Sequence, residues 1–207
     1  MKIFLLFLGI AAVAGVAFFY GCTRSSEPTL TLHKKPTGKV LVVVYSQSAN
    51  KNTGIVANWI RQQVGGDFFE IEMNEPYSDS YNTVLEEARQ HNENGIRPEI
   101  KPFTGNISDY DLIFIGSPIW YGTYAPPVGT FLASADWSGK TVIPFCTHGG
   151  GGAGKFYADL TAACPGAQVA EGLAVRGSNV VERFFGRSTE HKESPDVVIE
   201  WLNRILP

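Results

Sequence analysis

The chain has 207 residues, of which 44% are hydrophobic, 12% aromatic and 18% charged. This is enough apolar material for the core of one folded domain, and it excludes disordered and collagen-like chains. With 17 basic and 20 acidic side chains, the net charge of −3 lacks the basic excess that nucleic-acid binding requires. The three cysteines (Cys22, Cys146 and Cys164) form no CxxC motif, so neither a disulfide scaffold nor a cysteine zinc site is expected.

The N-terminal segment is the most hydrophobic part of the chain. Residues 3–21 carry no charged or amide side chain, which is typical of a segment that enters a membrane or a translocon. The segment ends in the letters FFYG directly before Cys22, and polar residues follow. This arrangement resembles the lipobox of bacterial lipoproteins, which implies a signal peptide over residues 1–21, cleavage before Cys22, and an exported domain attached to the membrane by acylated Cys22. An uncleaved membrane helix is the alternative, and the basic residues that follow it would then favour a cytoplasmic domain.

Residues 22–38 are rich in serine, threonine and proline and show no apolar periodicity. Such a composition predicts a flexible tether with a span of about 20 Å. No second linker follows, so residues 39–207 are expected to form one domain.

Strands and helices are predicted to alternate along this domain. The run at 39–46 is apolar without polar alternation, which is typical of a strand buried on both faces of a parallel sheet. Further strands are expected at 68–73, 111–116, 141–146 and 171–175. Helices are expected at 53–64, 81–91, 126–135, 155–163 and 195–206. This order predicts an α/β fold, a doubly wound five-stranded parallel sheet with helices on both faces. Ligands of such sheets bind at the carboxyl ends of the strands, which points to the segments after Tyr45, Gly116 and Cys146.

The segment 46–53 joins the first strand to a helix and consists mostly of hydroxyl and amide side chains, with one charge at Lys51. A phosphate group can be held there by hydroxyls, backbone N–H groups and the helix N-terminus. An ordinary helix-capping loop has a similar composition and remains the alternative.

The segment 116–123 places two neighbouring aromatic side chains, Trp120 and Tyr121, after a strand and between glycines. Their flat rings are suited to stacking on a planar heterocycle. The alternative is that both rings simply cover the edge of the core.

The segment 147–155 is rich in glycine. It is not a nucleotide P-loop, because Phe156 stands where a hydroxyl residue is needed to hold Mg²⁺. It does not belong to a serine hydrolase either, because the chain has no GxSxG motif to supply the nucleophile. We expect the loop to present bare backbone N–H groups to the polar edge of a ring. His148 is the histidine of this loop, and either capping of the loop or acid–base chemistry is open to it. No catalytic residue and no metal site is identified.

Four segments together resemble the flavodoxin-like family, in the variant group that carries PFCTHGG: KVLVVVYSQS (39–48), DLIFIGSPIWYG (111–122), PFCTHGG (144–150) and EGLAVRG (171–177). The resemblance implies strand order 2-1-3-4-5 and noncovalent binding of FMN. It implies a phosphate loop formed by Ser46, Gln47, Ser48, Asn50, Asn52 and Thr53. It places Pro118, Ile119, Trp120, Tyr121 and Gly122 beside the isoalloxazine ring, and Thr147, His148, Gly149 and Gly150 at its pyrimidine edge. The family's phosphate loop usually reads S-x-T-G-N-T, whereas here Ala49 replaces the glycine and Lys51-Asn52 lengthens the loop.

Acidic residues are concentrated between positions 67 and 111, where eleven carboxylates against three basic side chains give a net charge of −8. An acidic face near a cofactor would attract a basic protein partner, whereas a plain solvated surface is the alternative.

The sequence is therefore compatible with three functions. The first is a membrane-anchored flavodoxin-like protein that binds FMN and transfers electrons to a redox protein partner. The second is an FMN-dependent NAD(P)H oxidoreductase of the quinone reductase type, and the third is a binding module without a cofactor. Cys146 is either a redox thiol or core packing, and a disulfide between Cys146 and Cys164 is left open by the sequence.

Overall fold

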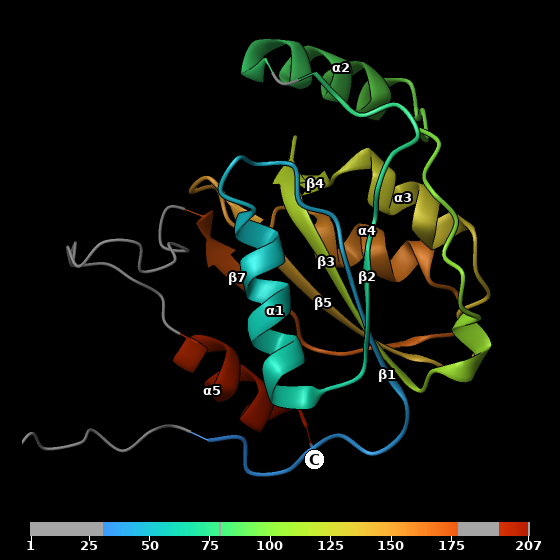
Figure 1. Cartoon of the computed structure of the whole chain (residues 1–207). Helices are drawn as coiled ribbons and strands as arrows, with labels where there is room; N and C mark the ends of the chain where they lie inside the picture. The colour runs from blue at the N-terminus through green and yellow to red at the C-terminus, as the bar shows by residue number, and fades with distance from the viewer. Residues whose placement is uncertain (1–30, 79, 178–194, 207) are drawn as a thin grey trace, which may run out of the picture.

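The computed structural model describes residues 31–78, 80–177 and 195–206 (Figure 1). The predicted signal peptide, the alternative membrane helix and Cys22 lie outside these residues. Among the described helices, none is long and apolar enough to cross a membrane.

A parallel sheet forms the centre of the domain. Its five positions run in the order β2-β1-β3-β5-β6, and these strands cover Asp67–Glu70, Val40–Val44, Leu112–Trp120, Thr141–His148 and Gln168–Val169. Two additional strands join it, because β7 (Leu173–Arg176) also pairs with β5 and the short β4 (Thr123–Tyr124) pairs antiparallel with β3. All five residues of β1 are buried, as the uninterrupted apolar run predicts. The predicted α/β fold with a doubly wound parallel sheet is confirmed.

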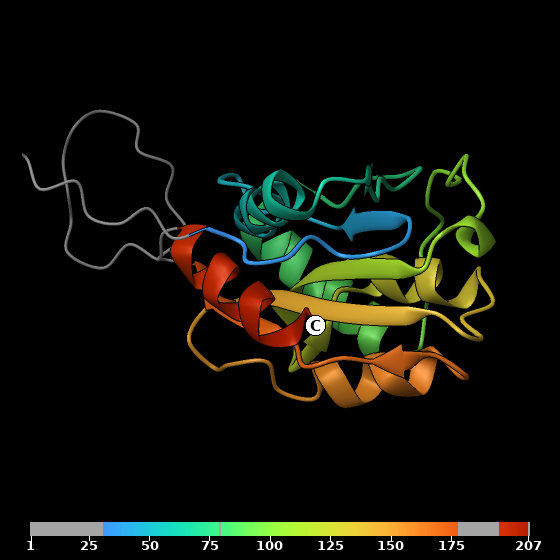
Figure 2. The same cartoon turned by 90° about the horizontal axis from the view of Figure 1, so that it is seen from below.

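Helices cover both faces of the sheet. Helices α1 (Asn52–Val64) and α5 (Pro195–Ile205) lie next to each other on one face, as Figures 1 and 2 show. Helices α3 (Pro126–Ala133) and α4 (Phe156–Ala163) cover the other face. Helix α2 (Tyr81–Glu93) lies above the carboxyl ends of the strands (Figure 1), and a 3-10 turn (Ile107–Asp109) precedes β3.

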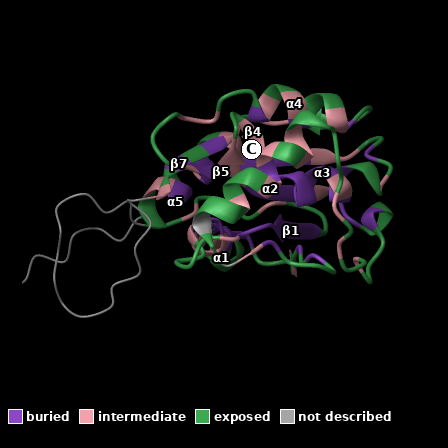
Figure 3. Ribbon diagram, turned by 90° about the horizontal axis from the view of Figure 1, so that it is seen from above, coloured by how far each residue is buried: buried purple, intermediate pink, exposed green. Residues whose placement is uncertain are grey.

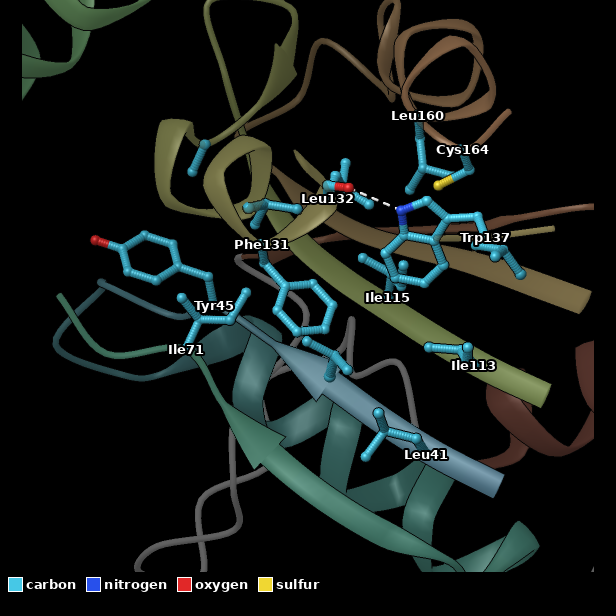
Figure 4. Close-up of a cluster of buried hydrophobic side chains, with 14 of the residues drawn as sticks. Leu41, Tyr45, Ile71, Ile113, Ile115, Phe131, Leu132, Trp137, Leu160 and Cys164 are labelled. Carbon is cyan, nitrogen blue, oxygen red and sulfur yellow. Dashed lines mark hydrogen bonds between the residues drawn. The ribbon is translucent and has the colours of Figure 1, made fainter. Parts of the chain in front are cut away.

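Each face of the sheet has its own hydrophobic core. The core beneath α3 is anchored by large aromatic side chains, and there the buried indole N–H of Trp137 donates a hydrogen bond of 2.7 Å to the carbonyl of Leu132 (Figure 4). The core beneath α1 and α5 contains Val56, Ile60 and Trp201. Both cores hold the strands rigidly, so the loops at the carboxyl ends start from fixed positions.

The segment 116–123 is mostly strand, so its prediction as a loop is wrong. The ladder between β3 and β5 continues as far as the pair Pro118 and Thr147, and the chain then returns through β4. The turn consists of Tyr121 and Gly122, with φ angles of 51° and 82°. Two left-handed residues are what a tight hairpin needs, and only the glycine adopts that conformation without strain.

Two other elements differ from the prediction. The fifth position of the sheet is divided between β6 and β7, and β6 was missed. Strand β2 ends at Glu70 instead of Met73, which forms an isolated antiparallel bridge with Ile100.

Candidate functional site

The three segments singled out in the sequence meet at the carboxyl edge of the sheet. The hydroxyl oxygens of Thr53 and Thr147 lie 2.8 Å apart and are buried, which joins the start of α1 to the end of β5. The backbone N–H of Lys155 donates to the carbonyl of Gly122 at 2.6 Å, which joins the glycine-rich loop to the hairpin turn. The topology therefore assembles one site from residues up to about one hundred positions apart.

The segment 46–51 combines helix capping with spare hydrogen-bond donors. The hydroxyl oxygen of Ser48 accepts from the backbone N–H of Asn52, and that of Ser46 accepts from Gly54, each at 3.2 Å. These bonds cap the first turn of α1, as the alternative reading of the loop expects. Because both hydroxyls act as acceptors there, each keeps a proton to donate to a ligand.

Backbone groups of the same loop are also free to bind. Within the described residues, the N–H groups of residues 47–50 donate to no protein acceptor. Ser48, Ala49 and Asn50 are exposed. The carbonyl oxygen of the Asn52 side chain is buried without a hydrogen-bond donor in the described structure. A ligand that carries an anion and hydroxyl groups would satisfy both kinds of group.

Lys51 does not point its charge at this anion site. Its ammonium group donates to the carbonyl of Ser46 at 2.6 Å and lies 3.2 Å from the carboxylate of Glu70. Its backbone is left-handed, with φ of 50°. The inserted lysine thus ties the loop to β2, and the anion site relies on neutral donors and the N-terminus of α1.

The two adjacent aromatic side chains have different surroundings. The partly buried ring of Trp120 meets Tyr45 and Tyr77 in edge-on contacts, with centroids 5.9 and 5.4 Å apart. This supports the reading in which Trp120 covers the core. Tyr121 is 53% exposed, and its hydroxyl donates to the carbonyl of Leu85 in α2 at 2.6 Å. Tyr121 therefore offers the more open ring at the site.

The remaining predicted ring contacts lie along β3 and the loop after β5. Pro118 and Ile119 are half-buried in β3. Gly122 and Gly149 face open space, since an added Cβ would meet no atom within 4 Å at either position. A flat ligand can thus approach the backbone at both glycines.

His148 closes the glycine-rich loop on itself. Its Nδ1 atom accepts from the backbone N–H groups of Gly150 at 3.1 Å and Gly152 at 3.2 Å. The capping role is therefore the one that the geometry supports, with Nδ1 as the acceptor of both bonds. The expectation of bare N–H groups is wrong for these two glycines, because the imidazole ring occupies them.

Arg176 is a polar residue of this edge that the sequence reasoning did not select. It is the last residue of β7 and pairs in register with His148. Three guanidinium atoms lie 3.7–3.9 Å from the position that a Cβ of Gly150 would occupy. The next residue, Gly177, passes close to the side-chain amide of Asn52. A single charged residue at a strand end forms no recognisable sequence motif. The position of Arg176 at the site follows from the pairing of β7 with β5.

Helix α2 brings acidic side chains to the same edge. Seen from above (Figure 3), it carries exposed residues over the buried strands. Arg89 donates to Glu86 and Glu93, and its hydrogen bond to Glu86 lowers the pKa of that carboxyl to about 2.

The 270 Å³ cavity beside the phosphate loop also has a charged rim, formed by Lys51, Glu70, Glu72 and Lys101.

The described cysteines are inert packing. Cys146 and Cys164 are both buried and free, so they form no disulfide. Burial raises the pKa of each thiol to about 12, which disfavours the reactive thiolate. No group of side chains in the described ranges is arranged to hold a metal ion.

The sequence signature of the family described as Flavodoxin matches residues 39–186. The chain belongs to the flavodoxin family. Its signature begins at the residue before β1 and spans all three site segments, so the flavodoxin match covers the whole carboxyl edge described above. A search of curated proteins finds no match.

Several solved structures resemble this flavodoxin. A protein assigned as a flavoprotein from Bacteroides eggerthii is 28% identical, with a TM-score of 0.65, over 81% of this chain and 98% of its own. One from Bacteroides uniformis is 27% identical with the same TM-score, over 82% and 99%. A flavoprotein from Lactobacillus acidophilus, crystallised in complex with FMN, is 26% identical with a TM-score of 0.56, over 69% and 96%.

Proposed function

We propose that this chain is a membrane-anchored flavodoxin that binds FMN noncovalently and transfers electrons to a protein partner. The observation that carries the proposal is the phosphate loop, where free N–H groups and hydroxyl protons gather at the N-terminus of α1. These donors match a phosphate group without needing a metal. The likeness to a flavoprotein that was crystallised with FMN supports the same cofactor.

The residues of the edge fit each part of FMN. Ser46, Ser48 and the free N–H groups of residues 47–50 would hold the phosphate. The unpartnered carbonyl of Asn52 fits a hydroxyl-bearing chain such as the ribityl group. Tyr121, with the open backbone at Gly122 and Gly149, would face the isoalloxazine ring. FMN, when bound, supplies the redox chemistry, and these residues orient the ring and limit its contact with water.

Transfer to a basic partner is supported by the position of the acidic residues. Helix α2 lies above the same edge (Figure 1), and its sequence contains Glu86, Glu87 and Glu93. A partner that approaches a bound flavin would therefore also approach this charge. Opposite charge would raise the association rate, and salt would lower it. NADPH should not reduce such a carrier directly, and rapid reduction in a stopped-flow experiment would favour the oxidoreductase alternative.

Membrane attachment would be through acylated Cys22, with the domain on the outer side of the membrane. Its test is the full-length Cys22→Ser variant, expressed beside the wild type with radiolabelled palmitate. We expect the wild type to carry label in the membrane fraction and the variant to carry none. A variant that stays in the membrane without label would support the uncleaved helix with a cytoplasmic domain.

FMN binding is tested by titrating the purified full-length chain with FMN and with riboflavin, which lacks the phosphate. Ser48→Ala should weaken FMN binding about tenfold, because one hydrogen bond to a charged group is lost, and leave riboflavin binding unchanged. Ser108→Ala, an exposed serine just before β3, is the matched control. A wild type that binds neither flavin would leave the cofactor-free module as the explanation.

A further inference from the structure

The cationic residue at the end of β7 has a defined relation to the glycine-rich loop. Arg176 leaves the sheet at the level of His148, because these two residues are paired in the ladder between β5 and β7. Its guanidinium lies against Gly150, where the absence of a side chain leaves room for the flat group. The cation is therefore held next to the loop that the resemblance places at the pyrimidine edge of the flavin.

The charge of Arg176 is available to a ligand. The described ion pairs join Lys39, Lys51, Lys101 and two other arginines to carboxylates, and Arg176 takes part in none of them. Within the described chain its guanidinium also makes no hydrogen bond, although the group carries five donors and is always charged. Arg176 is thus an exposed arginine that lies at the ligand edge without an ion pair in the described structure.

Two donors of the same loop are already occupied. His148 occupies the N–H groups of Gly150 and Gly152, so two amides that would face a ring edge are turned toward the imidazole. The pyrimidine edge of a flavin presents two carbonyl oxygens and a ring nitrogen that becomes negative on reduction. A cation beside this loop would take the place of these two donors and stabilise that negative charge.

We propose that Arg176 is a positioning residue for FMN that faces the pyrimidine edge of the ring and stabilises the reduced cofactor more than the oxidised one. This inference rests on the proposed binding of FMN. In this arrangement the positive charge of Arg176 would face the ring of FMN, and the neutral donors of the phosphate loop would bind its phosphate. Arg176 thereby opposes the effect of the carboxylates on α2, which disfavour a negative flavin.

The test is the reduction potential of FMN in the purified full-length chain, compared among the wild type, Arg176→Gln and Arg176→Lys. Arg61→Gln removes a matched exposed arginine from the last turn of α1, at the opposite end of the strands. For Arg176→Gln we expect reduced FMN to be bound about tenfold more weakly relative to oxidised FMN, which lowers the two-electron potential by about 30 mV. Arg176→Lys should recover most of the loss, and Arg61→Gln should leave the potential unchanged.

Titration with FMN and riboflavin separates the two parts of the cofactor. If Arg176 faces the ring, Arg176→Gln changes the binding of both oxidised flavins by the same small factor. A loss of FMN affinity with unchanged riboflavin affinity would place the arginine at the phosphate and overturn the inference, as would a potential equal to that of Arg61→Gln. Failure of the wild type to take up flavin would overturn the proposed function, and this inference with it.

Discussion

The hydroxyl pair of Thr53 and Thr147 gives a direct test of how the phosphate loop is joined to the sheet. The two side chains are 1% and 5% exposed, so neither hydroxyl can turn to water when its partner is removed. Thr53→Val or Thr147→Val leaves one buried hydroxyl unsatisfied, and each single change should cost about 1–2 kcal/mol. The double variant removes both hydroxyls in nearly the same shape and should cost less than about 1 kcal/mol, because no polar group is left without a partner.

The assay is urea unfolding of the flavin-free chain, followed by far-UV circular dichroism, for the four proteins of the cycle. The expected coupling free energy between the two sites is about 1–3 kcal/mol. Additive effects of the single changes would refute the argument, because they would mean that each hydroxyl finds another partner. A second readout is FMN affinity, which should fall in either single variant if the loop is displaced.

Three further predictions concern the same edge. Trp120→Ala should lower the free energy of unfolding by about 3 kcal/mol, while Trp120→Phe costs less, since the ring packs on two tyrosines; equal urea midpoints would contradict this. His148→Ala should speed hydrogen exchange at the two amides that its Nδ1 accepts from, measured by NMR, and unchanged protection would argue against the capping role. With pKa values raised to about 12, Cys146 and Cys164 should resist iodoacetamide at pH 8 until the chain is unfolded, as read by peptide mass; labelling of the folded chain would refute their burial.

The positions of the main strands along the chain were predictable because each follows from a local pattern, whereas their order in the sheet was implied by the family resemblance. The four valines and one leucine of β1 indicate burial on both faces. The alternation of strands with helices leaves few possible topologies. The extension of β3 was not predictable in this way. Gly116 and Pro118 are typical loop residues, and they lie in a strand here because the neighbouring β5 continues the ladder past them.

The candidate site shows the same limit. The loops that form it were found from their composition and from the rule that ligands lie at the carboxyl ends of strands. What each side chain does there depended on partners distant in sequence. Trp120 and Tyr121 have different surroundings because Trp120 contacts Tyr45 and Tyr77. Tyr121 instead donates to Leu85. The place of Arg176 beside the glycine-rich loop follows from the register of β7 with β5.

The edges of the sheet have a consequence for how molecules of this protein meet one another. On one side β2 has only four residues, and acidic residues at its two ends pair with Lys39 and Lys51. On the other side the edge is divided into pieces of two and four residues. Within the described chain, edge strands of this length offer little template for a strand of another chain. The molecule is thus protected against aggregation through its sheet when many copies are crowded together.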